Sequence, residues 1–166
     1  MSLPSRTIRA IKEGRLMPKG DLDICLDEAR AFYEVGKGCV NAECGLPISP
    51  RIYPAIVNLA FSCELHFKAL MIWRNTDRSF KMGHNLVDLF NLLSAADQNG
   101  IKGLYVSTIS DRSFEDSIEE FDKAFDNWRY AFQDSEEDNV CTIHDLVRFA
   151  GAVHDHVKKI IRPEGG

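Results

Sequence analysis

The hydrophobic residues of this chain recur at the spacing of α-helices. The clearest case is an apolar stripe at alternating steps of four and three residues, which predicts one helix over residues 111–133. The stripe consists of Phe114, Ile118, Phe121, Phe125, Trp128 and Phe132. No segment of useful length alternates between apolar and polar residues, as a half-buried strand would. The pattern therefore predicts an all-α protein.

Further helices are predicted where the same spacing ends at helix-breaking residues. They cover residues 21–37, 52–74, 85–94 and 142–161. The first is expected to end at Gly36 and Gly38, with a loop over residues 40–50. The second is apolar on two sides, which is typical of a central helix. Residues 95–106 are ambiguous, because two glycines interrupt their helical pattern.

Long helices joined by short connections predict an up-and-down bundle of four to five helices. The chain has 166 residues, of which 45% are hydrophobic and 27% charged, and this favours a single globular domain over residues 21–163. Residues 1–20 form a basic N-terminal arm with five basic side chains and one acidic side chain. Such an arm either contacts RNA phosphates or an acidic partner, or is a terminus with no such role.

The charge and the most apolar window of the chain bear on its partners and location. The net charge is −5, so the field of the whole molecule does not attract nucleic acid. No secretory signal opens the chain. The apolar window 53–73 is interrupted by Asn58, Glu64, His66 and Lys68, and charges within one span are costly in a bilayer. We therefore expect a cytoplasmic protein without membrane contact.

The sequence predicts neither a metal centre nor a cofactor. The five cysteines are odd in number and scattered, which is typical of reduced thiols. Cys39 and Cys44 are the one close pair, but their spacing lacks the two-residue gap of zinc knuckles. His154 and His156 lie two positions apart, so on a helix they point about 200° apart and cannot chelate one ion together.

Three stretches of the chain carry a family resemblance. They are residues 60–70 (AFSCELHFKAL), residues 83–90 (GHNLVDLF) and residues 124–130 (AFDNWRY). In this order they resemble the HEPN superfamily, which comprises all-helical bacterial and archaeal domains of toxins, phage-defence ribonucleases and partners of nucleotidyltransferases. The similarity spans about residues 52–133, roughly half of the chain. It implies an HEPN-like helical bundle, a homodimer, and an RNA- or nucleotide-associated protein of a defence or toxin–antitoxin type system.

The resemblance also implies a catalytic pair. Active members of the superfamily use an Arg followed by a His after four to six residues on the last long helix, and two such pairs meet in a dimer around an RNA phosphate. Arg148 and His154 match this pattern on the last predicted helix, whereas Arg78 and His84 match its spacing in a loop, where the family has no catalytic Arg. The guanidinium of Arg148 would stabilise the phosphorane charge and His154 would move the proton, which gives a metal-independent endoribonuclease. Six helical steps put the two side chains about 120° apart, so they can share a site only across a groove.

The alternative is a catalytically silent module that binds a ligand or a partner protein through a polar cluster. Glu64 lies on an apolar helix, so we expect it to pair with Arg129 or with Lys68 one turn later. The cluster of Glu64, Lys68, His84 and Arg129 is either a structural ion-pair group or a polar pocket for a phosphate or nucleotide. His84 follows Gly83 at a helix start and is either an N-terminal cap or a ligand that points inward.

A polar stripe accompanies this cluster on the central helix. Asn58, Ser62 and His66 recur at steps of four residues and therefore share one face. The stripe either lines the same pocket as Glu64 or is the solvent edge of the helix.

Overall fold

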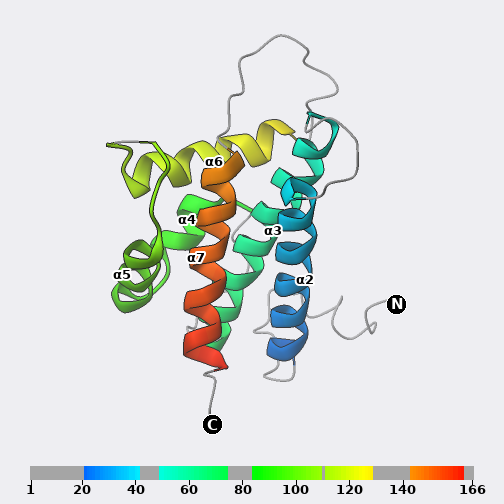
Figure 1. Cartoon of the computed structure of the whole chain (residues 1–166). Helices are drawn as coiled ribbons and strands as arrows, with labels where there is room; N and C mark the ends of the chain where they lie inside the picture. The colour runs from blue at the N-terminus through cyan, green and yellow to red at the C-terminus, as the bar shows by residue number, and fades with distance from the viewer. Residues whose placement is uncertain (1–20, 42–48, 75–83, 110, 129–142, 163–166) are drawn as a thin grey trace.

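The computed structural model describes residues 21–41, 49–74, 84–109, 111–128 and 143–162. These residues form helices and no strand, which confirms the all-α prediction (Figure 1). The helices are α2 (Asp21–Asn41), α3 (Ser49–Trp73), α4 (Leu86–Asn91), α5 (Ala95–Leu104), α6 (Phe114–Trp128) and α7 (Ile143–Ile161). The described part of the chain thus has six helices where four to five were predicted. The basic arm over residues 1–20 lies outside the described residues.

α3 is the central helix of the bundle, as its two apolar sides predicted. It contacts α2, α4, α6 and α7. α2, α3 and α7 run side by side along the length of the molecule, while α6 lies across their upper end and α4 and α5 lie to one side (Figure 1). The arrangement is therefore a helical bundle, but α6 departs from a regular up-and-down order.

The apolar stripes that predicted the helices form one core. Its largest fully buried side chains include Ile56 and Phe67 of α3, Phe121 of α6 and Phe149 of α7. Phe149 is the centre of an aromatic cluster, with ring centroids 5.3 Å from Phe114 and 5.2 Å from Phe121. Burial of these stripes supplies the main driving force for packing α6 and α7 onto α3.

Two predicted helix ends differ from the structure. α2 continues through Gly36 and Gly38 to Asn41. A Cβ added at Gly36 would lie 2.7 Å from Cγ of Leu59, so the glycine lets α2 approach α3 closely. α3 begins at Ser49, within the segment predicted as a loop.

The glycine-interrupted segment is also helical, and α6 starts later than predicted. α5 runs from Ala95 to Leu104 without a break at its glycines. α6 begins at Phe114 because Ser113 caps it: the Asp116 amide donates to the Ser113 hydroxyl over 3.0 Å, and that hydroxyl donates to the Asp116 carboxylate over 2.6 Å. Residues 129–133 of the predicted helix lie outside the described residues.

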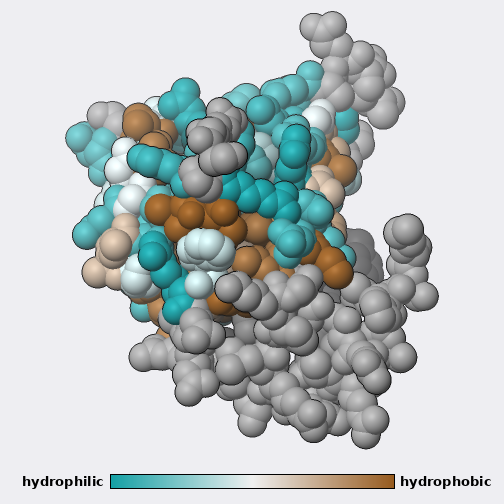
Figure 2. Space-filling model, turned by 90° about the horizontal axis from the view of Figure 1, so that it is seen from below, coloured by the Kyte–Doolittle hydropathy of each residue, from teal (hydrophilic) through white to brown (hydrophobic). Residues whose placement is uncertain are grey.

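α3 is long and apolar enough to cross a membrane by length and composition alone. Within residues 51–73, 67% of the most apolar window is buried inside the bundle, and the core helix of a bundle meets the same criterion. α2 begins and α3 ends at the lower end of the molecule, where Ile24 and Trp73 are 41% and 42% exposed. Figure 2 shows an apolar area in the middle of this lower face, with polar residues along one side of it.

Candidate functional site

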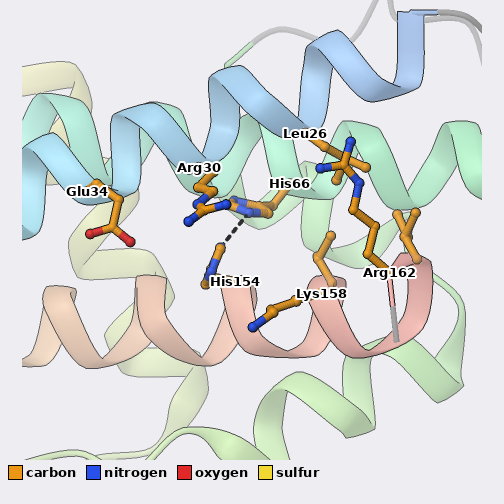
Figure 3. A pocket seen from close by; sticks show the side chains of 9 residues that line it. Leu26, Arg30, Glu34, His66, His154, Lys158 and Arg162 are labelled. Atoms are coloured by element: carbon orange, nitrogen blue, oxygen red, sulfur yellow. Dashed lines mark hydrogen bonds between the residues drawn. The ribbon is translucent and has the colours of Figure 1, made fainter. Parts of the chain in front are cut away.

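A cavity of about 240 Å³ lies between α2, α3 and α7 (Figure 3). Its polar lining comes from all three helices: Arg30 and Glu34 of α2, His66 of α3, and His154, Lys158 and Arg162 of α7. The apolar lining consists of Leu26, Val157 and Ile161. This volume lies below the range of about 300–1,000 Å³ that is usual for drug-sized ligands, so the cavity suits a small polar group.

Two histidines form a hydrogen-bonded pair at the inner wall of the cavity. His66 is only 2% exposed, and its Nδ1 lies 2.7 Å from the carbonyl oxygen of Ser62. Because a carbonyl oxygen can only accept, Nδ1 of His66 carries the proton and Nε2 is left as an acceptor. Nδ1 of His154 lies 3.1 Å from that Nε2 and therefore donates to it. The neutral His154 ring is thereby held with an unprotonated Nε2, which remains for a ligand.

The surroundings of the pair keep both rings uncharged. Burial lowers the pKa of His66 to about 4, against an opposing contribution from its hydrogen bond to Ser62. Burial also lowers the pKa of His154, although Asp155 and Glu34 act in the opposite direction. The His154 ring stacks on Tyr33 with centroids 4.7 Å apart, which fixes its orientation. At neutral pH His154 is therefore a positioned base.

Cationic side chains border the histidine pair. Arg30 is exposed on α2 and lies beside His66 in Figure 3, and Lys158 follows His154 by one turn on α7. Arg162 is the third cation, but its guanidinium is paired with Asp23 at 2.9 Å and with Asp27 at 3.1 Å. Arg30 and Lys158 also line the cavity, and their positive charges favour an oxyanion near His154.

Arg148 does not share this cavity. Its guanidinium lies 3.4 Å from the carbonyl oxygen of Val106, and it lines another groove with Leu104, Gly151 and Asp155. Within one chain the fold therefore does not bring Arg148 and His154 together, in keeping with their separation of about 120° around the helix.

The Glu64 cluster forms a separate ion-pair group. The Glu64 carboxylate is 3% exposed and accepts from Lys68, which confirms the predicted pairing one turn apart. It also accepts from Nδ1 of His84, 3.0 Å from Oε1 and 2.9 Å from Oε2. His84 is not a cap, because Asn85 caps α4 by accepting from the Asp88 amide. The other predicted partner, Arg129, lies outside the described residues.

The cluster therefore ties α3 to the start of α4, and neither Glu64, Lys68 nor His84 lines the His154 cavity. The Glu64 carboxylate is already satisfied by two donors.

The polar stripe of Asn58, Ser62 and His66 neither lines a pocket with Glu64 nor forms the solvent edge of the helix. Ser62 and His66 are buried, and His66 lines the His154 cavity. Asn58 instead donates to the carbonyl of Pro54 over 2.6 Å.

His156 belongs to a second buried group, on another side of α7 from His154. Its Nε2 lies 3.0 Å from Oδ1 of Asp97. The Asp97 carboxylate also accepts from Arg74, through Oδ2 over 3.0 Å and through Oδ1 over 2.9 Å. Burial alone would raise the pKa of Asp97, but hydrogen bonds from Arg74, Ser94 and His156 outweigh it and hold the pKa at about 2. In the described part of the chain, no group of three or more His, Cys, Asp or Glu could hold a metal ion.

Sequence reasoning missed the residues that complete the cavity. The pairing of His66 with His154 joins positions 88 residues apart, and no local pattern reveals it. A weaker signal was present for Lys158, because it lies four residues after His154 and so shares its helix face. Arg30 had no such signal. Comparisons with protein-family models, with curated proteins and with solved structures find no match to this chain.

Proposed function

We propose that this chain is an HEPN-like, RNA- or nucleotide-associated protein that binds a phosphate group in the cavity between α2, α3 and α7. One observation carries the proposal: the neutral His154 ring is fixed with Nε2 left for a ligand, in a cavity that the cationic side chains of Arg30 and Lys158 also line. An anionic oxygen held by these cations would lie beside a base of the kind that phosphodiester cleavage needs. The assignment to a defence or toxin–antitoxin type system rests on the family resemblance.

The chemistry is that of a metal-independent endoribonuclease. Nε2 of His154 takes the proton of a ribose 2′-hydroxyl and the 2′-oxygen attacks the adjacent phosphorus. The bond from phosphorus to the 5′-oxygen breaks, and the 5′-oxygen takes a proton from water. Charge on the phosphoryl oxygens is stabilised by Arg30 and Lys158, in the role that the resemblance gave to Arg148. His66 is a positioning residue, because it holds Nδ1 of His154 and touches no reacting atom.

The test is RNA cleavage in the presence of chelator, with labelled single-stranded and structured RNAs. We expect the parent chain to cleave, His154→Gln to lose cleavage, and Arg148→Ala to retain it. His144→Gln is the matched control, since His144 is an exposed histidine on the same helix. Thermal unfolding of each variant ensures that a loss of activity does not reflect a loss of fold.

RNA binding, measured by fluorescence anisotropy, separates the two parts of the proposal. Binding without cleavage that weakens in Arg30→Gln and Lys158→Gln would retain the phosphate site and refute the catalytic role of His154. Absence of both binding and cleavage would refute the whole proposal. The Glu64 cluster does not favour the alternative of a ligand site at that position, because Lys68 and His84 already satisfy its carboxylate.

A further inference from the structure

One acidic side chain lines the His154 cavity together with its cations. Glu34 is exposed on α2, one turn after Arg30. In Figure 3 it extends from α2 toward α7 at one end of the cavity, and Arg162 lies at the other end. Arg162 is paired with carboxylates near the start of α2, but in the described part of the chain no ion pair or hydrogen bond engages Glu34. Both oxygens of its carboxylate can therefore accept from a ligand.

Glu34 lies close to the proposed base. Its neighbour Tyr33 stacks on the His154 ring, with centroids 4.7 Å apart. Burial lowers the pKa of His154, while the charges of Asp155 and Glu34 act on that ring in the opposite direction. A ligand that contacts Nε2 of His154 therefore has other groups within reach of Glu34.

A carboxylate at this position determines which part of an RNA can face it. It accepts hydrogen bonds but donates none, and it repels a phosphate. In the proposed reaction the 2′-hydroxyl faces His154, and the 3′- and 5′-oxygens of the same nucleoside are esterified. The base then supplies the remaining donors. The cavity of about 240 Å³ is too small for a whole nucleotide, so the base lies near its opening, where Glu34 is exposed.

The pattern of donors differs among the RNA bases. Guanine carries two neighbouring donors on its Watson–Crick edge, N1–H and the N2 amino group, and they match the two oxygens of one carboxylate. Adenine and cytosine have one donor beside an acceptor, and uracil has one donor between two acceptors. With these bases a carboxylate oxygen faces another acceptor, which costs binding free energy.

We propose that Glu34 makes the cavity selective for guanosine, by accepting from N1–H and from the N2 amino group of the nucleoside whose 3′-phosphate lies beside His154. This inference rests on the proposed function, because it names the nucleoside that supplies the attacking 2′-hydroxyl. Glu34 determines specificity and takes no part in proton transfer. Cleavage is therefore expected on the 3′ side of guanosine.

The test is the binding of nucleoside 3′-monophosphates to the full chain, measured by isothermal titration calorimetry. We expect the guanosine compound to bind about tenfold more tightly than those of adenosine, cytidine and uridine. The inosine compound, which lacks the N2 amino group, should have an intermediate affinity. Glu34→Gln should reduce the guanosine preference to about twofold or less, because an amide presents one acceptor and one donor to the base.

The guanosine preference is a ratio of affinities, so a general effect of charge cancels from it. Removal of the Glu34 charge acts on the phosphate of every compound alike. Asp155→Asn is the matched control, because Asp155 also acts on the pKa of His154 but lines the groove beside Arg148 and not this cavity. It should leave the guanosine preference unchanged.

The results that would overturn the proposal differ from those that would overturn the proposed function. Equal affinity for all of these compounds, weakened alike by Lys158→Gln, would refute the selectivity and retain the phosphate site. A guanosine preference that persists in Glu34→Gln would refute the role of Glu34. Absence of binding for every compound would refute the proposed function together with this inference.

Discussion

His66 is deeply buried, but both of its ring nitrogens form hydrogen bonds, so no polar atom of the ring is left unsatisfied. Nδ1 donates to the backbone of its own helix, and Nε2 accepts from His154 of α7. A protonated His66 would lose the hydrogen bond from His154 and would carry an unsolvated charge. The residue that orients the proposed base is therefore itself sensitive to acid.

This burial predicts an acid-dependent loss of stability. The pKa of His66 is about 4 in the folded chain and 6.5 as its ordinary value, so between these values the unfolded state binds more protons. Stability from this residue is fully present above about pH 6.5 and is lost as the pH falls toward about 4. We expect His66→Asn to reduce the difference in unfolding free energy between about pH 7 and pH 4.5 by about 2 kcal/mol.

Urea unfolding at several pH values measures this difference. His144→Asn is the control, because His144 is exposed and its substitution should leave the pH dependence unchanged. An unaltered pH dependence in His66→Asn would show that protonation of His66 does not oppose folding.

At the scale of elements, two glycines of α5 have opposite environments. A Cβ added at Gly100 would lie 2.2 Å from Cε1 and 2.5 Å from Nδ1 of His156, whereas nothing lies within 4 Å of one added at Gly103. His156 cannot easily move aside, because it is buried and bonded to Asp97. Gly100 therefore sets how closely α5 packs against α7.

Gly100 and Gly103 allow a comparison of two alanine substitutions within a single helix. Gly100→Ala should destabilise the chain by about 1–3 kcal/mol, because overpacking against a fixed side chain exceeds the helix-propensity gain of about 1 kcal/mol. Gly103→Ala should be neutral or stabilising by up to about 1 kcal/mol. Thermal unfolding of the two variants measures both effects, and equal shifts would contradict the packing explanation.

The sequence could predict those parts of the fold and the site that depend on local spacing, but not those that depend on contacts between distant residues. Periodicity identified α3, α6 and α7, because the core-facing residues of each helix recur at helical spacing. The spacing of Glu64 and Lys68 predicted their ion pair. Gly36 of α2 lies close against Leu59, and Gly100 of α5 lies close against His156, so these glycines allow close packing and do not end their helices. Such distant contacts leave no local pattern, and the same is true of the pairing between His66 and His154.

At the scale of the whole molecule, the charge limits how the proposed site can engage RNA. The chain carries a net charge of −5, so long-range attraction does not favour a polyanion. Beyond about 8 Å at physiological ionic strength, charges are largely screened, and binding then depends on local cations. Arg30 and Lys158 are those cations at the cavity.

The number of contacts can be read from the salt dependence of RNA binding. Each phosphate neutralised on a single strand contributes about 0.7 to the slope of log Kobs against log salt concentration, so the one phosphate proposed for the cavity predicts a slope of about −0.7. The double variant Arg30→Gln/Lys158→Gln should remove most of this slope, and Lys123→Gln on α6 should leave it unchanged. Anisotropy titrations over a range of salt concentrations give these slopes. A slope that persists in the double variant Arg30→Gln/Lys158→Gln would place the phosphate contacts outside the cavity, and the five basic side chains of residues 1–20 are then the segment to substitute next.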